Sequence, residues 1–134
     1  MLIDSGASGN FITQKFIDAG RETLNACLTG MEPKIVKLAN GSTIKTNRML
    51  TDVNTNVKNK SLPCSFVVLP ELNNSYDAIL GMPYLENADP DISFSNKTFN
   101  WRSNDSILHS NSQPFNAASI NLNQTPFDQK FRRN

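Results

Sequence analysis

The sequence has few of the residues that metal sites and thiol chemistry need. Its 134 residues include two cysteines, Cys27 and Cys64, and a single histidine, His109. A zinc site or a Cys–His nucleophile pair needs more such partners at closer spacing, so we expect no metal and no cofactor. The two isolated cysteines predict free thiols in a reducing compartment, with a disulfide between them as the open alternative.

Charge and hydropathy give no sign of a nucleic-acid or membrane partner. Lysine and arginine number 13 against 12 acidic residues, a net charge of +1, so no polyanionic partner is predicted. No apolar run approaches the roughly 20 residues that span a bilayer. Residues 1–10 lack the basic start and apolar core of a secretory signal. We therefore expect a cytoplasmic protein, and the length leaves room for one domain with a modest core.

The most informative motif lies near the amino end, where Asp4-Ser5-Gly6-Ala7 follows the apolar residues 1–3. An apolar strand that ends in an acid, a hydroxyl residue and a glycine can present a carboxylate on a tight turn. The glycine permits close backbone approach, and the alanine leaves space beside the acid. Taken alone, Asp-Ser-Gly is also an ordinary surface turn.

Two later segments add to this motif. The segment Ala39-Asn40-Gly41-Ser42 lies between apolar flanks and predicts a hairpin with an Asn-Gly turn. The segment Ile79-Leu80-Gly81, followed by Met-Pro-Tyr-Leu, predicts a buried strand, a glycine and a short helix. Each segment alone has an ordinary interpretation as a hairpin turn or a core strand. Their order and spacing together are far more specific.

The three segments together resemble the retropepsin-like aspartic proteases, especially those of gypsy-type LTR retrotransposon polyproteins. The resemblance covers roughly residues 1 to 101. It implies that Asp4 is the catalytic carboxylate, within an active-site loop completed by Ser5, Gly6 and Ala7. It also implies that residues 39–42 form the flap over the substrate, and that residues 79–81 lie behind the active-site loop.

Hydrolysis of a peptide bond by carboxylates needs two of them at one water molecule. Carboxylates about 3 Å apart share a proton, so one acts as base and the other as acid. The chain holds one Asp-Ser-Gly, so a second copy would supply its own Asp4 across a two-fold axis. We expect a homodimer that binds an extended polypeptide as an added strand beneath the flap.

Short strands and one or two brief helices predict an all-β fold, a small closed β barrel of the retropepsin type. A helix is predicted within residues 11–19, with Thr13 as N-cap, and another from Pro83 to the Asp89-Pro90 pair. Alternate residues from Met49 to Val57 are expected to share one face of a half-buried strand. The remaining strands are expected over residues 35–38, 43–46, 61–69, 78–80, 92–94 and 98–101.

Residues 1–102 are expected to form the protease domain and residues 103–134 a disordered Ser/Asn/Gln-rich tail or linker. Family members carry further strands before the catalytic loop, so we expect an amino-terminally truncated domain whose first strand has an unpaired edge. The leading hypothesis is an aspartic endopeptidase that matures a retroelement polyprotein. The alternatives are a catalytically silent remnant or domesticated binding module and, disfavoured because the sequence holds no ubiquitin-like segment, a cellular protease of the ubiquitin-shuttle type.

Overall fold

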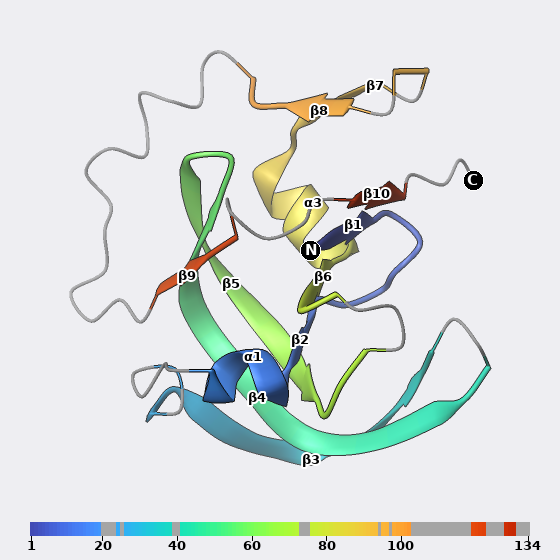
Figure 1. The fold of residues 1–134 in the computed structure, drawn as a ribbon, viewed down its shortest axis with the longest axis vertical. Helices are drawn as coiled ribbons and strands as arrows, with labels where there is room; N and C mark the ends of the chain where they lie inside the picture. Colours follow the sequence, from blue (N-terminus) through green and yellow to red (C-terminus); the bar gives the residue numbers. More distant parts are fainter. Residues whose placement is uncertain are drawn as a thin grey trace.

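The computed structural model describes residues 1–19, 24, 26–38, 41–72, 76–93, 95–96, 98–102, 119–122 and 128–130. Strands dominate these residues, and the helices among them are short (Figure 1). The elements are β1 (Leu2–Asp4), β2 (Phe11–Thr13), α1 (Gln14–Asp18), β3 (Leu28–Lys37), β4 (Thr43–Val57), β5 (Lys60–Leu69), β6 (Ala78–Leu80), α3 (Met82–Ala88), β7 (Asp91–Ser93), β8 (Thr98–Asn100), β9 (Ser119–Asn121) and β10 (Asp128–Lys130).

The main sheet has eight strands in the order β10-β1-β6-β2-β5-β4-β3, with β9 paired to β4. The strands β3, β4 and β5 are long, and β3 and β4 project as an arm at the lower side of the molecule in Figure 1. The all-β class predicted from the sequence is confirmed. Among the described strands the hydrogen-bonded path is open from β10 to β3, and closure into a barrel is not among these pairings.

The hydrophobic side chains form a main core and a smaller second cluster. The main core includes the fully buried Ile3, Ile12, Leu50 and Leu80, which come from β1, β2, β4 and β6. The second cluster is built on Val36, Leu69 and Leu72, with partly buried Phe11, Leu38, Ile44, Val67, Tyr76 and Ile79 packed against it. The second cluster connects the end of β3 and the start of β4, next to their hairpin turn, to the strands near Asp4.

The structure differs from the sequence-based prediction at two places, where the local pattern of apolar residues was misleading. Phe11 and Ile12, whose apolar side chains were counted toward the helical spacing, instead form β2 with Thr13 between β5 and β6, and the helix begins after Thr13. Thr13 is nevertheless the predicted N-cap, because its hydroxyl accepts a hydrogen bond from the Phe16 N–H at 3.1 Å. In β4 the predicted alternation fails at Asp52, where φ is 52° and the register with β5 shifts between Leu50 and Val53. This bulge buries Leu50 and leaves Thr51 exposed.

Two short stretches of the expected tail join the sheet, so the expectation of disorder is wrong for them. β9 runs parallel to β4, with Ile120 and Leu122 each 1 % exposed in the main core. β10 runs parallel to β1 over three residue pairs. The edge of β1 that was expected to be unpaired is therefore occupied. The other residues of 103–134 lie outside the described part of the chain, where the disordered tail stays a prediction.

The predicted final strand pair is confirmed as β7 and β8, and it packs against the turn between β4 and β5. The Lys58 ammonium donates to the Phe99 carbonyl at 2.9 Å and lies 4.5 Å from the centre of its ring. The Lys60 ammonium lies 4.7 Å from the centre of the Trp101 ring, and the Trp101 indole N–H donates to the Lys58 carbonyl at 3.2 Å. These cation–π and hydrogen-bond contacts attach the small second sheet to the main one.

Candidate active site

Asp4 is the last residue of β1, a strand that is buried because Met1, Leu2 and Ile3 are all apolar. These three residues are at most 7 % exposed, and Asp4 itself is 9 % exposed. β1 runs parallel to β6 with Ile3 opposite Leu80, and parallel to β10 with Asp4 opposite Lys130. Strands on both sides thus fix the point at which the carboxylate leaves the sheet.

The loop after β1 folds back on the Asp4 carboxylate. The Gly6 N–H donates to Asp4 Oδ1 at 2.8 Å, and the Ala7 N–H donates to the Asp4 carbonyl at 3.1 Å. A side-chain oxygen bonded to the backbone two residues ahead is the Asx turn that acidic residues favour in tight loops. The loop therefore orients the carboxylate by its own backbone.

Gly81 packs directly against this loop. A methyl group built on its α-carbon would clash with the Gly9 carbonyl oxygen and lie 2.7 Å from the Ala7 carbonyl oxygen. The Met82 N–H donates to that same Ala7 oxygen at 2.9 Å. The absence of a side chain at residue 81 is what lets the start of α3 approach the loop so closely.

Asn10 joins the loop to α3 and to β5, a role that the sequence analysis did not predict. Its Oδ1 accepts from the Gly81 N–H at 2.9 Å and from the Tyr84 N–H at 3.3 Å, while its Nδ2 donates to the Ser65 carbonyl at 3.2 Å. Gly81 is the N-cap of α3 and has no side chain, so Asn10 caps that helix from a distant position. An asparagine in a Ser/Gly-rich loop looks like a turn residue, which is why this role was missed.

We expect Asn10→Ala to lower the free energy of unfolding by about 3 kcal/mol, because it leaves two buried N–H groups and one carbonyl without their partner. Urea unfolding at fixed protein concentration measures the change. Asn47→Ala, at an exposed position of β4, is the matched control and should change stability by less than about 0.5 kcal/mol. Equal stabilities for the two variants would show that the Asn10 bonds contribute nothing.

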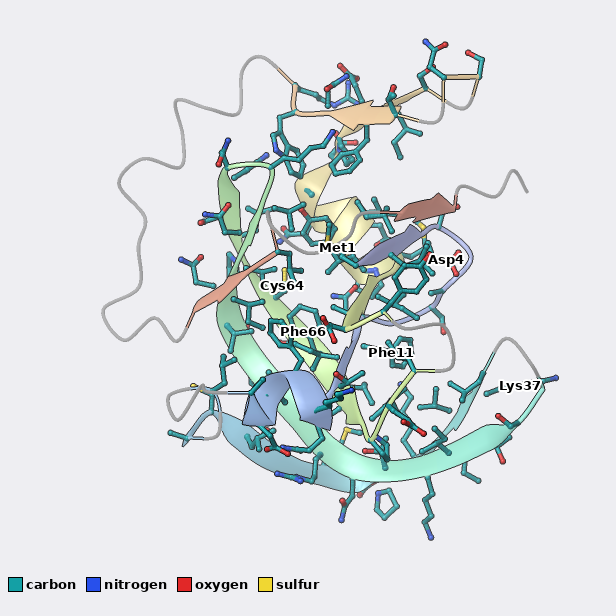
Figure 2. All side chains as sticks on the ribbon, viewed as in Figure 1. Met1, Asp4, Phe11, Lys37, Cys64 and Phe66 are labelled. Atoms are coloured by element: carbon teal, nitrogen blue, oxygen red, sulfur yellow. The ribbon has the colours of Figure 1, made fainter. Side chains whose placement is uncertain are left out.

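A cavity of about 350 Å³ opens in front of Asp4. The active-site loop contributes Gly6, Ala7 and Ser8 to its wall, and the β3–β4 arm contributes residues 34–38. The second hydrophobic cluster supplies apolar lining through Phe11, Leu69, Leu72 and Ile79. Figure 2 shows Asp4 at the end of β1, Phe11 below it in that view, and Lys37 at the outer end of the arm. The cavity thus lies between a floor that carries the acid and a projecting hairpin.

The hairpin at the end of the arm is the segment predicted to be the flap. Gly41 has φ +87°, a backbone conformation that favours glycine, and its N–H donates to the Leu38 carbonyl at 3.0 Å. The Leu38 N–H donates to the Ser42 carbonyl at 2.8 Å. Ala39 and Asn40 lie outside the described residues. Of the predicted flap, the structure therefore describes Gly41 and Ser42.

The structure brings the residues predicted for the site together around Asp4, apart from the flap tip. Ser5, Gly6 and Ala7 form the loop, Ile79 and Leu80 lie on the neighbouring strand, and Gly81 abuts the loop from behind. Gly41 and Ser42 belong to the separate arm. The chemical roles assigned to these residues stay predictions. Besides Asn10, the sequence did not identify the arm residues Lys34 and Lys37, which line the cavity.

Two titratable side chains are strongly affected by burial, and both lie away from the cavity lining. Burial raises the pKa of the Cys64 thiol to about 11, partly offset by a hydrogen bond with Thr55. Burial, with a smaller contribution from Cys64, also raises the pKa of the Tyr84 phenol. Both groups are therefore neutral at physiological pH. Cys27 and Cys64 are free thiols, so the open alternative of a disulfide between them is not formed.

The described part of the chain holds no group of three or more His, Cys, Asp or Glu side chains that could bind a metal ion. None of the helices in the described ranges is long and apolar enough to cross a bilayer.

The all-β fold places a buried acid, held by a tight loop, at the floor of a cavity. A family model described as the PEG10/RTL1 protease domain matches residues 1–110. Because the match covers most of the chain, the chain belongs to the PEG10/RTL1 protease domain family. This membership supports a protease-like enzyme of retrotransposon-derived origin. No curated protein matches the sequence.

Proposed function

We propose that the protein is an aspartic endopeptidase whose active site forms between two copies of the chain. The observation that supports this most directly is the position of Asp4, buried at the end of β1 and lining the cavity beneath the β3–β4 arm. Among the described residues that line the cavity, Asp4 is the only carboxylate. A two-carboxylate mechanism therefore requires the Asp4 of a second copy.

In the proposed mechanism the two Asp4 carboxyls share one proton, because two like charges about 3 Å apart do not both ionise. The charged member takes a proton from the attacking water. The protonated member polarises the carbonyl of the substrate and then protonates the departing amine. The Gly6 N–H and the packing of Gly81 behind the loop would hold each carboxylate in place during these transfers.

The substrate is an extended polypeptide lying in the cavity between the floor and the arm. Backbone groups of the arm would bind it as an added strand, and the apolar lining would hold its side chains. Closure of the hairpin that contains Gly41 and Ser42 would exclude water from the dyad. The retroelement origin of the family supports processing of a polyprotein as the biological reaction.

The proposal is tested by incubating the full chain with an unfolded polypeptide such as denatured casein, over a range of pH and protein concentration. We expect cleavage that is favoured below neutral pH, is blocked by a statine-type inhibitor, and increases in specific activity with concentration as dimers form. Sedimentation analysis gives the fraction of dimer at each concentration. Full specific activity where the chain is monomeric would overturn the shared dyad. A dimer that binds polypeptide without cutting it would favour a binding module instead.

A further inference from the structure

The β3–β4 arm, defined as residues 28–38 and 41–50, is more basic than the rest of the chain. It carries Lys34, Lys37, Lys45 and Arg48 against a single acid, Glu32, giving a net charge of +3. The whole chain has a net charge of +1, so the remainder carries −2. All four basic side chains are exposed. The arm thus presents a positive surface in a nearly neutral protein.

Two of these four residues, Lys34 and Lys37, line the cavity with Asp4. Lys34 is two residues from Val36 along β3, and side chains two apart on a strand share a face. Val36 is 6 % exposed and belongs to the second hydrophobic cluster, so Lys34 lies on the cluster side of the arm. Neither lysine forms an ion pair with a residue that the structure describes. Lys37 follows Val36 directly, so its side chain lies on the opposite face of β3. The alkyl stem of Lys34 can follow apolar surface while its ammonium group reaches a ligand.

We propose that the cavity selects polypeptides in which an acidic residue flanks an apolar side chain. The apolar lining from Phe11, Leu69 and Leu72 would receive the apolar side chain, and Lys34, on the same face of β3 as Val36, would meet the flanking carboxylate. The basic arm would also attract an acidic chain from a distance. This inference rests on the proposed function, because it assigns a substrate class to the same cavity. The simpler interpretation of the lysines is a solvated outer face, and the test separates the two.

The test measures binding with Asp4→Asn, which cannot cleave by the proposed mechanism, so that the readout is independent of catalysis. Three fluorescent peptides share an apolar centre and carry Glu, Gln or Lys on both sides. We expect the Glu peptide to bind about tenfold more tightly than the Lys peptide. The difference should shrink between about 0.01 M and about 1 M salt, where the screening length falls from about 30 Å to about 3 Å.

The matched variants change the same charge at different places on the arm. Lys34→Glu, at the cavity, should reverse the preference toward the Lys peptide. Lys45→Glu, on the same arm but outside the cavity lining, should only reduce the long-range attraction. Equal effects of the two variants, or equal binding of the three peptides, would overturn the inference. Thermal unfolding confirms that each variant is folded.

The outcome for the proposed function is read separately, from cleavage of the same peptides by the unmodified chain. Cleavage of all three peptides at equal rates would leave the endopeptidase in place and remove the acidic preference. Preferential binding of the Glu peptide without cleavage of any peptide would sustain the preference and count against the endopeptidase.

Discussion

Asp4→Asn is expected to lower kcat for polypeptide cleavage about 10²- to 10⁴-fold, the range typical of losing a general acid–base group. The substitution keeps the size of the side chain and an oxygen that can accept from the Gly6 N–H, now 2.8 Å from Asp4 Oδ1. The fold should therefore be preserved. Steady-state cleavage gives kcat, and urea unfolding shows whether stability is unchanged.

The control is Asp52→Asn, which removes an exposed carboxylate at the bulge of β4, outside the cavity lining. It changes the net charge by the same amount, and Asn tolerates the positive φ of 52° at that position. Its activity should match that of the unmodified chain. Comparable losses in both variants would mean that Asp4 acts only through net charge.

Mixing provides a sharper test of the shared dyad. When Asp4→Asn is added in excess to the unmodified chain, mixed dimers with a single Asp4 should form and activity should fall as the unmodified homodimer is depleted. The control is the same excess of the double variant Asp4→Asn, Gly81→Ala. Where this variant is unfolded it cannot form mixed dimers, so activity should not fall. Activity that is indifferent to added Asp4→Asn, under conditions where sedimentation shows exchange of subunits, would remove the second copy from the mechanism.

Gly81→Ala is expected to have the other large effect, on stability and activity together. The added methyl group meets the carbonyl oxygens of Gly9 and Ala7, which are backbone atoms and cannot rotate away. Overpacking of this kind costs about 3 kcal/mol. A displacement of the loop by about 1 Å would also lower kcat about 100-fold, because the Asp4 carboxylate would lose its alignment. Urea unfolding and steady-state cleavage measure the two effects.

Gly30→Ala is the matched control, because a methyl group at that position of β3 meets nothing within 4 Å. It should leave both stability and activity close to those of the unmodified chain. If Gly81→Ala behaved like Gly30→Ala, the close packing of α3 against the active-site loop would have no mechanical importance.

The sequence predicted the elements whose signals are local. Pro83 and the Asp89-Pro90 pair bounded α3, and the structure has this helix over Met82–Ala88 with proline in its first turn. The family resemblance, rather than a local signal, implied that Gly81 lies close behind the Asp4 loop, and the structure places it there. Proline restricts the backbone at its own position and glycine frees it, so these effects can be predicted without knowing the fold.

Features that depend on distant partners could not be predicted. Residues 11–13 are a strand because β5 and β6 flank them, although their apolar spacing suits a helix. Ile120 and Leu122 lie in a polar stretch and become core residues only because β4 offers an unpaired edge. The three side-chain bonds of Asn10 reach residues 55 to 74 positions away. None of these arrangements produces a periodic pattern of residues in the sequence from which it could be predicted.

The strand that carries Asp4 is synthesised before either of the strands that flank it. Ile3 pairs with Leu80 on one side and with Gln129 on the other. At about 5–20 residues per second, translation needs several seconds to supply the second neighbour. Contacts between such distant positions also form slowly once the residues are available. For the proposed endopeptidase, this delay keeps the hydrolytic centre unassembled until residues 128–130 have been synthesised.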